Sequence, residues 1–232
     1  GVGPSPRSSF AAAHDPSRDR MVIFGGHPGS PSHGLGDSWE LSLSTMTWSR
    51  YQPFPETDTE HASVFDPVRN RVLVLGGSAG GIRQNDVWTL PANNLRAGTK
   101  LTPAGSPPAP RMGHSAIYDP TRDRVVVFGG LGSSLFNDTW VLQLSGTPTW
   151  SPLTTTGTLP LPRHNHSAIY DPLRDRMIIY GGSGPGSDLW ELTFSGTPNW
   201  APLATTGITP LARTGQSGIY DPNSDRMLVF GG

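Results

Sequence analysis

The chain repeats one pattern at an almost constant interval. Five Gly-Gly pairs each end a run of apolar residues, and successive pairs lie 51, 53, 52 and 50 residues apart. A period near 50 residues is typical of folds made of stacked copies of one supersecondary unit. The five pairs are Gly25-Gly26, Gly76-Gly77, Gly129-Gly130, Gly181-Gly182 and Gly231-Gly232.

Two strands are expected before each pair. Asp-Pro followed by polar residues predicts a turn, because aspartate bonds its own backbone and proline presets φ. In the third repeat the turn at Asp119-Pro120 joins an expected strand at 115–118 to another at 124–128. The second strand is apolar on both faces, which indicates a sheet that is covered on both sides.

Two further strands are expected after each pair, and tryptophan marks both. All seven tryptophans fall in these two positions, and Lys100 takes the fourth-strand position in the second repeat. We interpret the rings as packing between neighbouring sheets, where replacing a buried tryptophan by alanine costs roughly 3–5 kcal/mol. The third-strand motifs are Trp39-Glu40-Leu41, Trp88-Thr89-Leu90, Trp140-Val141-Leu142 and Trp190-Glu191-Leu192, and the fourth strands carry Trp48, Trp150 and Trp200.

Taken together, these features resemble the Kelch repeat. The best copies, 125–163 and 177–213, read as an apolar run ending in Gly-Gly, then Asn/Ser-Asp-x-Trp, a second tryptophan, and Pro-x-x-Arg. The resemblance covers nearly the whole chain. It implies an all-β fold, a Kelch-type β-propeller of four-stranded antiparallel blades around a central channel.

The repeat predicts four complete blades plus two strands of a fifth, in one propeller segment over 1–232. Segment 1–7 aligns with 157–163, which follows a fourth strand. We therefore expect a segment of a longer propeller of about five to eight blades. A dimer in which a neighbour caps the open edge is the alternative. The expected units are about 7–53, 55–104, 107–156 and 159–206, with a half unit at 208–232, and the second unit has an insertion at 91–98.

Composition argues against several classes. The net charge is −1 and no Lys/Arg run occurs, so we expect neither nucleic acid nor a membrane surface as partner. The absence of cysteine excludes disulfides, zinc–thiolate sites and the cysteine-linked tyrosine of Kelch-like copper radical oxidases. No apolar run approaches the roughly 20 residues of a membrane span. The lysine-poor, Thr/Ser/Pro/Gly-rich composition favours a secreted or extracellular bacterial protein, with the compartment left open.

Polar residues that recur in every unit are expected to be structural. His61, His114 and His166 share one position at the start of the innermost strand, which Phe10 and Gln216 occupy elsewhere. An unbroken ring of imidazoles could bind a metal, but this ring is interrupted, so we predict no metal and no cofactor. A catalytic carboxylate should be unique, whereas these residues repeat: Arg20, Arg71, Arg124, Arg176, Arg226, Asp37, Asp86, Asp138 and Asp188.

Candidate binding residues lie on loops at one face. An arginine precedes the inner strand in four repeats, and the resemblance places it near the loops that line the channel. There its guanidinium could bind carboxylates or phosphates, or could bond loop carbonyls instead. The second repeat lacks it, reading Asp58-Thr59-Glu60-His61. The candidates are Arg7, Arg111, Arg163, Arg213, His27, Ser78, Arg83, Asn165 and Ser183, with His33 and Phe136 in the same loops.

This scaffold predicts a ligand-binding or protein-interaction module whose loops bind a protein, a peptide or a glycan. One alternative is a Kelch-type enzyme, such as a mutarotase, a specifier protein or another sugar-active protein, whose acidic and basic residues we do not align here. Another is an excised or engineered propeller fragment without a ligand of its own. No catalytic residue is assigned.

Overall fold

The computed structural model describes residues 3–29, 34–51, 59–184 and 187–232, and it contains no helix among them. The chain forms two compact units. The first comprises Gly1–Pro103 with Ala109–Met112, and the second comprises Ala104–Pro108 with Gly113–Gly232. Among the described residues, nothing has the helical length and apolarity that crossing a bilayer requires.

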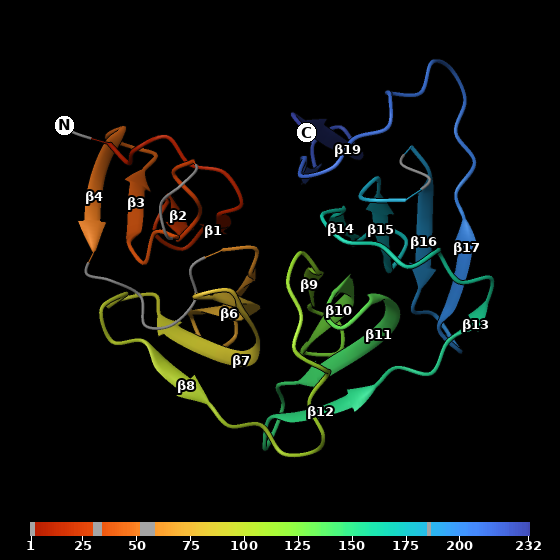
Figure 1. Ribbon diagram of the computed structural model, residues 1–232, viewed down its shortest axis with the longest axis horizontal. Coiled ribbons are helices and arrows are strands. Elements are labelled where there is room, and N and C mark those ends of the chain that lie inside the picture. Colours follow the sequence, from red (N-terminus) through yellow and green to blue (C-terminus); the bar gives the residue numbers. More distant parts are fainter. Residues whose placement is uncertain (1–2, 30–33, 52–58, 185–186) are drawn as a thin grey trace. The chain divides into compact units, whose positions relative to one another are not determined.

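The first unit contains two four-stranded antiparallel sheets, in which each strand pairs with the next one along the chain (Figure 1). We call them blade 1 and blade 2. Blade 1 consists of β1 (Ala11–Asp15), β2 (Arg20–Phe24), β3 (Ser38–Ser42) and β4 (Thr47–Tyr51), and blade 2 of β5 (Ala62–Asp66), β6 (Arg71–Ala79), β7 (Ile82–Pro91) and β8 (Thr99–Leu101).

The second unit contains blade 3, blade 4 and a two-stranded sheet that we call blade 5 (Figure 1). The short strand β13 joins the outer edge of blade 4 in parallel. Blade 3 consists of β9 (Ser115–Asp119), β10 (Arg124–Leu131), β11 (Leu135–Gln143) and β12 (Thr149–Pro152). Blade 4 consists of β13 (Thr156–Gly157), β14 (Ser167–Asp171), β15 (Arg176–Tyr180), β16 (Leu189–Thr193) and β17 (Asn199–Pro202), and blade 5 of β18 (Ser217–Asp221) and β19 (Arg226–Phe230).

Consecutive blades of one unit stack face to face, which buries the second strand on both sides. In the second unit, Val126 and Phe128 of blade 3 pack against Met177 and Trp200 of blade 4. The rings of Phe128 and Trp200 have centroids 4.7 Å apart. Trp200 is fully buried. This is the packing role predicted for the tryptophans of both strand positions, although Trp48 of a fourth strand and Trp140 and Trp190 of third strands are only half-buried.

The expected strands agree with the structure in kind and order. The prediction that Lys100 takes the tryptophan position of the fourth strand is wrong. Lys100 lies opposite Trp88 in the β7–β8 ladder, as Arg50 lies opposite Trp39. The fourth-strand tryptophans instead lie opposite the leucine of the third strand, as Trp150 does with Leu142.

The insertion at 91–98 forms part of the core of the first unit, because Leu95 is buried in the same apolar cluster as Val22 of blade 1 and Val74 of blade 2. The expected boundaries at residues 53 and 55 lie outside the described residues.

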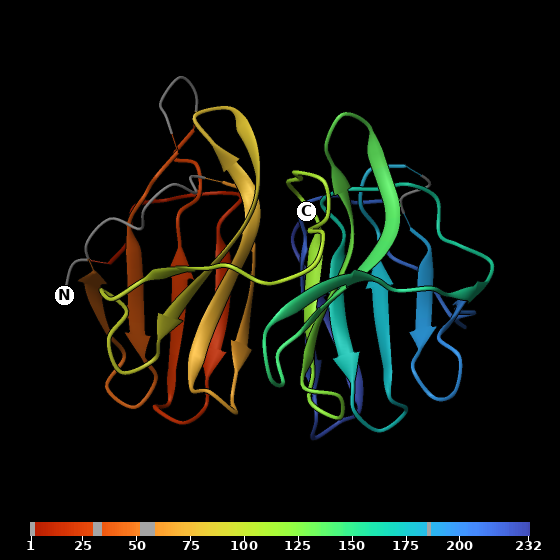
Figure 2. The same cartoon turned by 90° about the horizontal axis from the view of Figure 1, so that it is seen from below.

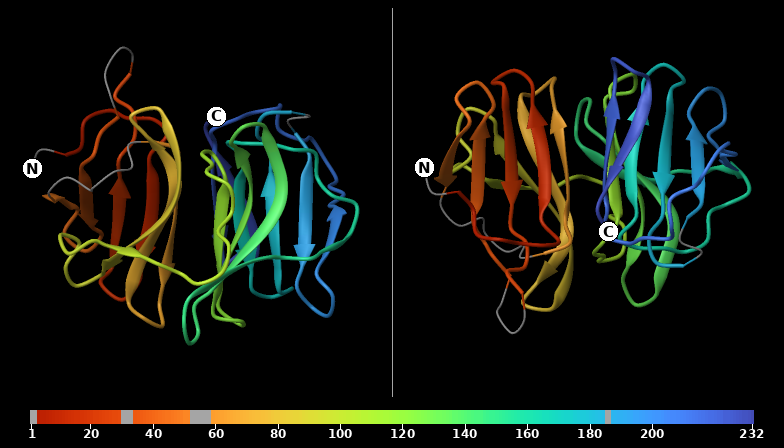
Figure 3. Two further views of the ribbon diagram at one scale, coloured as in Figure 1. Left: turned by 60° about the horizontal axis from the view of Figure 1, so that its bottom comes forward. Right: turned by 90° about the horizontal axis from the view of Figure 1, so that it is seen from above.

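Turns alternate between the two ends of every sheet (Figure 2). The Asp-Pro turns join the first strand to the second at one end, and the Gly-Gly segments join the second strand to the third at the other. In the second unit β18 lies beside β14, as Figure 3 shows, so blade 5 stacks on blade 4. The loops named as binding candidates therefore all belong to the Gly-Gly end, which we call the loop end.

Candidate functional site

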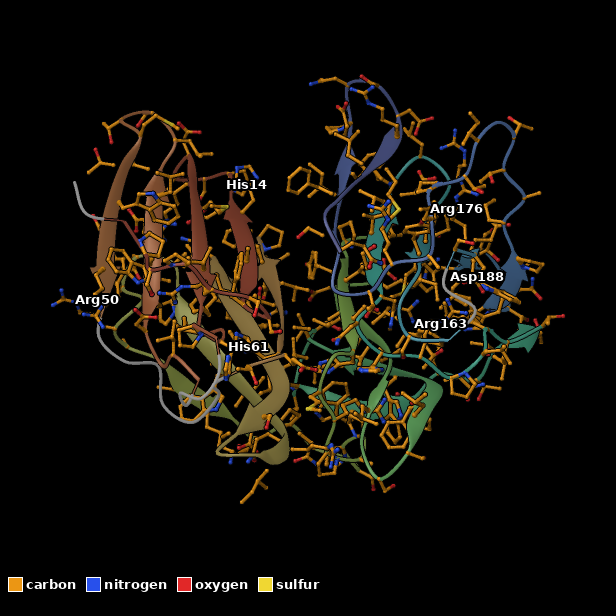
Figure 4. The ribbon with its side chains drawn as sticks, turned by 45° about the horizontal axis from the view of Figure 1, so that its top comes forward. His14, Arg50, His61, Arg163, Arg176 and Asp188 are labelled. Atoms are coloured by element: carbon orange, nitrogen blue, oxygen red, sulfur yellow. The ribbon has the colours of Figure 1, made fainter. Side chains whose placement is uncertain are left out.

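An arginine bound to an aspartate organises the loop end of blade 4. Arg163 donates two hydrogen bonds to Asp188, of 2.7 Å to Oδ1 and 2.8 Å to Oδ2. Its guanidinium also donates to the carbonyls of Gly181 and Leu161. Asp188 in turn accepts from the indole nitrogen of Trp190 at 2.6 Å. We call this arrangement the arginine clip, and Figure 4 shows its two charged members side by side.

Blade 1 contains the same clip. Arg7 donates to Asp37 Oδ1 at 2.5 Å and to the carbonyl of Gly25 at 2.9 Å, and Asp37 accepts from Trp39. Burial alone would raise the pKa of Asp37, but the bonds from Arg7 and Trp39 hold it below its usual value. For Asp188 the bond from Arg163 is the largest cause of the lowered pKa. Both aspartates are therefore anionic at neutral pH.

The clip changes what the predicted arginine candidates can do. The side chain of Arg163 is 0% exposed and that of Arg7 only 3%, so their guanidiniums position the loop end rather than face solvent. Arg111 is also buried and donates to the carbonyl of Ala109. Arg213 is half-exposed, and its bonds go to the carbonyls of Leu211 and Gly231. Of the two roles considered, bonding of loop groups is the one these contacts show.

A left-handed residue before each inner strand links neighbouring blades. In the second unit the amide of Asn165 donates to the carbonyl of Gly113 at 2.7 Å, and Gly215 donates to Asn165 at 2.9 Å. In the first unit Glu60 donates to Ser9 at 3.0 Å. All five residues have positive φ, between 54° and 74°. Sequence reasoning missed this feature because three of the five are not glycine.

The histidine at the start of the inner strand is buried and contacts the neighbouring blade. His166 Nε2 lies 2.8 Å from the hydroxyl of Ser115 in the preceding blade. Burial, followed by the nearby Arg163, lowers the pKa of His166 to about 3, so the imidazole is neutral. Gln216, which replaces histidine in blade 5, makes a longer contact of 3.4 Å to Ser167. These contacts agree with the structural role predicted for the position.

The residue after each Gly-Gly pair is tied to the segment before the inner strand. The predicted candidates His27, Ser78 and Ser183 occupy this position and bond the backbones of Ser8, Thr59 and His164, respectively. Ser183 Oγ also lies 2.5 Å from His164 Nδ1. The second glycine of the pair permits this approach, since a Cβ on Gly182 would lie 2.7 Å from the carbonyl oxygen of His164.

In two blades the second and third strands continue past the Gly-Gly pair as a hairpin. In blade 2, β6 and β7 pair through Ser78↔Arg83 to Ala79↔Ile82, past a bulge at the Gly-Gly pair. In blade 3, β10 and β11 pair similarly as far as Leu131↔Leu135. The sequence predicts loops here, whereas the structure has paired strands. A short polar or glycine-rich turn between residues able to form strands, such as Gly80-Gly81, is the sequence feature that predicts such a hairpin.

Of the remaining candidates, one is exposed and two are half-buried. Arg83 is exposed on the blade 2 hairpin, and Asn165 is half-buried beside His164. His27 is half-buried, and its Nδ1 accepts from the amide of Gly29. His33 lies outside the described residues. Within the described parts of the chain, no group of three or more His, Cys, Asp or Glu side chains is arranged to hold a metal ion.

Four-stranded antiparallel blades that repeat in one register and stack face to face define a β-propeller of the Kelch type. A family model described as the KLHDC2/KLHL20/DRC7 Kelch-repeats domain matches residues 1–182 and 93–232. The chain therefore belongs to the Kelch-repeat family. The structure is also similar to that titled "Structure of YjhT", with a TM-score of 0.72 and 17% identity over 95% of this chain and 71% of that one, which supports the fold alone.

Curated relatives share the repeat inside much longer proteins. Human host cell factor 2 is 30% identical over 208 residues, covering 78% of this chain and 25% of its own length. The flagellar outer arm dynein alpha chain of Chlamydomonas reinhardtii is 31% identical over 204 residues, and mouse multiple epidermal growth factor-like domains protein 8 is 33% identical over 195. This chain spans only 4% and 7% of those two proteins, respectively.

Proposed function

We propose that the chain is a protein-interaction scaffold that binds a protein or peptide through its loop end. The supporting observation is that repeated and variable residues differ in their contacts. The repeated Arg7, Arg163 and His166 bond groups within the chain, whereas Ile82 and Arg83, which differ from their counterparts in other blades, are exposed. Within each unit the loop end thus combines internally bonded repeat residues with variable side chains, and loops held by a scaffold in this way commonly carry recognition.

The tip of the β6–β7 hairpin is the centre of this proposed surface. Ile82 is 69% exposed, and the neighbouring Arg83 is exposed without a salt-bridge partner among the described residues. An apolar side chain beside an unpaired guanidinium suits a partner that offers an apolar contact and a carboxylate. The apolar component favours a protein or peptide over a glycan.

The test compares two ends of the same blade. A photo-crosslinker at Ile82 should capture a partner that a crosslinker at Val68, 65% exposed in the Asp-Pro turn, does not capture. With the captured partner purified, Arg83→Glu should weaken binding by about tenfold or more, and Val68→Asp should leave it unchanged. Equal capture from both ends, or equal effects of the two substitutions, would exclude the loop end as the binding surface.

A further inference from the structure

We propose that the loop end of blade 2 binds an extended peptide segment that carries a basic and an acidic residue about three positions apart. The basic residue binds the carboxylate of Glu60, and the acidic residue binds the guanidinium of Arg83. The proposal rests on the proposed binding of a partner at the loop end and specifies the chemistry of that partner. Both charged groups belong to the first unit, and both are specific to blade 2.

Glu60 supplies an unpaired carboxylate. Its side chain is half-buried, and its buried Oε2 atom accepts no hydrogen bond from the described chain. A buried carboxylate oxygen without a donor is costly, and proteins normally satisfy such an atom. A lysine or arginine of a bound partner provides both the missing donor and the opposite charge.

The same position carries no charge in the other blades. Glu60 is the left-handed residue before the inner strand, with φ +55°. Glycine and asparagine adopt this conformation more readily than glutamate does, so the turn itself does not account for the residue. The carboxylate is therefore a variable feature of the loop end, since the other blades have Ser9, Gly113, Asn165 and Gly215 at this position.

Arg83 supplies the second charge. Its guanidinium is exposed and forms no ion pair with a described residue. Arg83 lies opposite Ser78 in the β6–β7 ladder, and the corresponding pair of blade 3 is Leu131 and Leu135. Blade 3 therefore has an apolar pair where blade 2 has a free cation that can bind a carboxylate through two parallel hydrogen bonds.

Backbone pairing sets the spacing of the two charges. Thr59 pairs with Ser78, and Ser78 pairs with Arg83, so these three residues form one row across the loop end of the blade. Neighbouring strands lie about 4.8 Å apart, so the row spans about 10 Å, and Glu60 directly follows Thr59. Because an extended peptide advances about 3.3 Å per residue, a basic and an acidic residue about three positions apart match this row.

Hydrogen bonds hold the row in place without a ligand. The amide of Thr59 donates to the carbonyl of Ser78 at 3.2 Å, and the amide of Ser78 donates back at 2.9 Å. The amide of Glu60 donates to the carbonyl of Ser9 in blade 1 at 3.0 Å. A surface whose backbone is already ordered loses less conformational entropy when a peptide binds.

A random peptide library tests the charge pattern without assuming a partner. Phage-displayed heptapeptides are selected in parallel on the unsubstituted chain, on Glu60→Gln and on Arg83→Gln. We expect the unsubstituted chain to enrich peptides with Lys or Arg about three positions from Asp or Glu. Glu60→Gln should lose the basic preference and keep the acidic one, and Arg83→Gln should do the reverse. The matched controls Asp19→Asn and Arg96→Gln remove exposed charges outside the loop end and should leave the pattern unchanged.

An enriched peptide then gives the size of each contact by fluorescence polarisation. Glu60→Gln and Arg83→Gln should each weaken binding about tenfold, the effect of losing one charged hydrogen-bonding partner. Replacing the basic residue of the peptide by glutamine should weaken binding to the unsubstituted chain to the same degree and have no further effect on Glu60→Gln. This double-mutant comparison assigns the basic residue to Glu60 and separates a direct contact from a general loss of folding.

The outcomes separate this proposal from the proposed function. Enriched peptides without a basic and acidic pair, or with the same preferences on both variants, would overturn the charge pattern and leave loop-end binding in place. A partner captured by the crosslinker at Ile82, with no peptide enriched from the library, would do the same. No capture at Ile82 together with no enriched peptide would overturn both.

Discussion

Blade 4 and blade 2 pair the same half-buried, repeated aspartate with different cations. In blade 4, Asp188 is bound by Arg163, which reaches it from the segment before the inner strand. In blade 2, Asp86 is paired with Lys100 of the outer strand, 2.7 Å from its Nζ, and the lysine side chain is 47% exposed. The arginine position of blade 2 holds Asp58, which lies outside the described residues. The aspartate thus keeps a cation in both blades, but only in blade 4 is that cation a buried crosslink.

The two blades also differ where they meet the preceding blade. Arg122 of blade 3 binds both carboxylate oxygens of Asp175 in blade 4, at 2.9 and 2.7 Å. At the matching place in the first unit, Arg18 of blade 1 makes one bond of 2.7 Å to the side-chain oxygen of Asn70. A bidentate charged pair is stronger and more directional than a single bond to a neutral amide. Blade 4 therefore has a bidentate ion pair at its loop end and another near its Asp-Pro turn. Blade 2 has a weaker contact at each of these two places.

The largest predicted effect is the loss of the buried crosslink. Arg163→Met keeps the length of the side chain but removes the cation that pairs with the carboxylate of Asp188. Arg163 is fully buried, but the Asp188 side chain is 29% exposed. Removing one partner of a buried ion pair costs about 3–5 kcal/mol, so we expect a loss in the free energy of unfolding at the low end of that range, about 3 kcal/mol. Urea denaturation followed by tryptophan fluorescence measures it, and hydrogen exchange of the β15 and β16 amides shows where the loss occurs.

Lys100→Met is the matched control in blade 2. Because Lys100 is exposed, its pair with Asp86 is screened by solvent, and we expect a loss of about 0–1 kcal/mol. Equal losses for the two substitutions would show that burial does not distinguish the blades and would contradict the comparison.

A second prediction concerns how the free energy of unfolding depends on pH. The pKa of Asp188 is lowered in the folded chain, chiefly by Arg163, so its contribution is fully present above the unfolded pKa of about 4 and is lost as pH falls below it. Asp188→Asn cannot titrate at this position. At pH 7 we expect it to cost about 1.5–3 kcal/mol, as loss of a hydrogen-bonded charge does. Below pH 4 the difference from the unsubstituted chain should shrink, as measured by urea denaturation across pH 3–7. A difference that stays constant with pH would show that titration of Asp188 does not contribute to the loss of stability in acid.

Much of this arrangement follows from the sequence, because strand order depends on local signals. The Gly-Gly period, the Asp-Pro turns and the tryptophan positions each reflect backbone or burial requirements that act within one repeat. The arginine clip could not be assigned in the same way, since Arg163 and Asp188 are 25 residues apart and either could have faced a ligand. The left-handed turn at Glu60 and Asn165 was missed for a related reason. Its conformation is imposed by bonds to another blade and not by the residue type.

The smallest predicted effect would strengthen blade 2 instead of weakening blade 4. Asn70 has φ +51°, close to the 49° of Asp175, so Asn70→Asp fits the same left-handed turn. The new carboxylate would face Arg18, whose side chain is about as exposed as that of Arg122, at 31% and 30%. Pairs at such exposure contribute little, so we expect a gain of about 0.3–1 kcal/mol that falls as salt is raised. Combining Asn70→Asp with Arg18→Gln separates the pair from the added charge. If the gain survives without Arg18, it arises from the charge alone and the difference between the two blade contacts is not the arginine pairing inferred here.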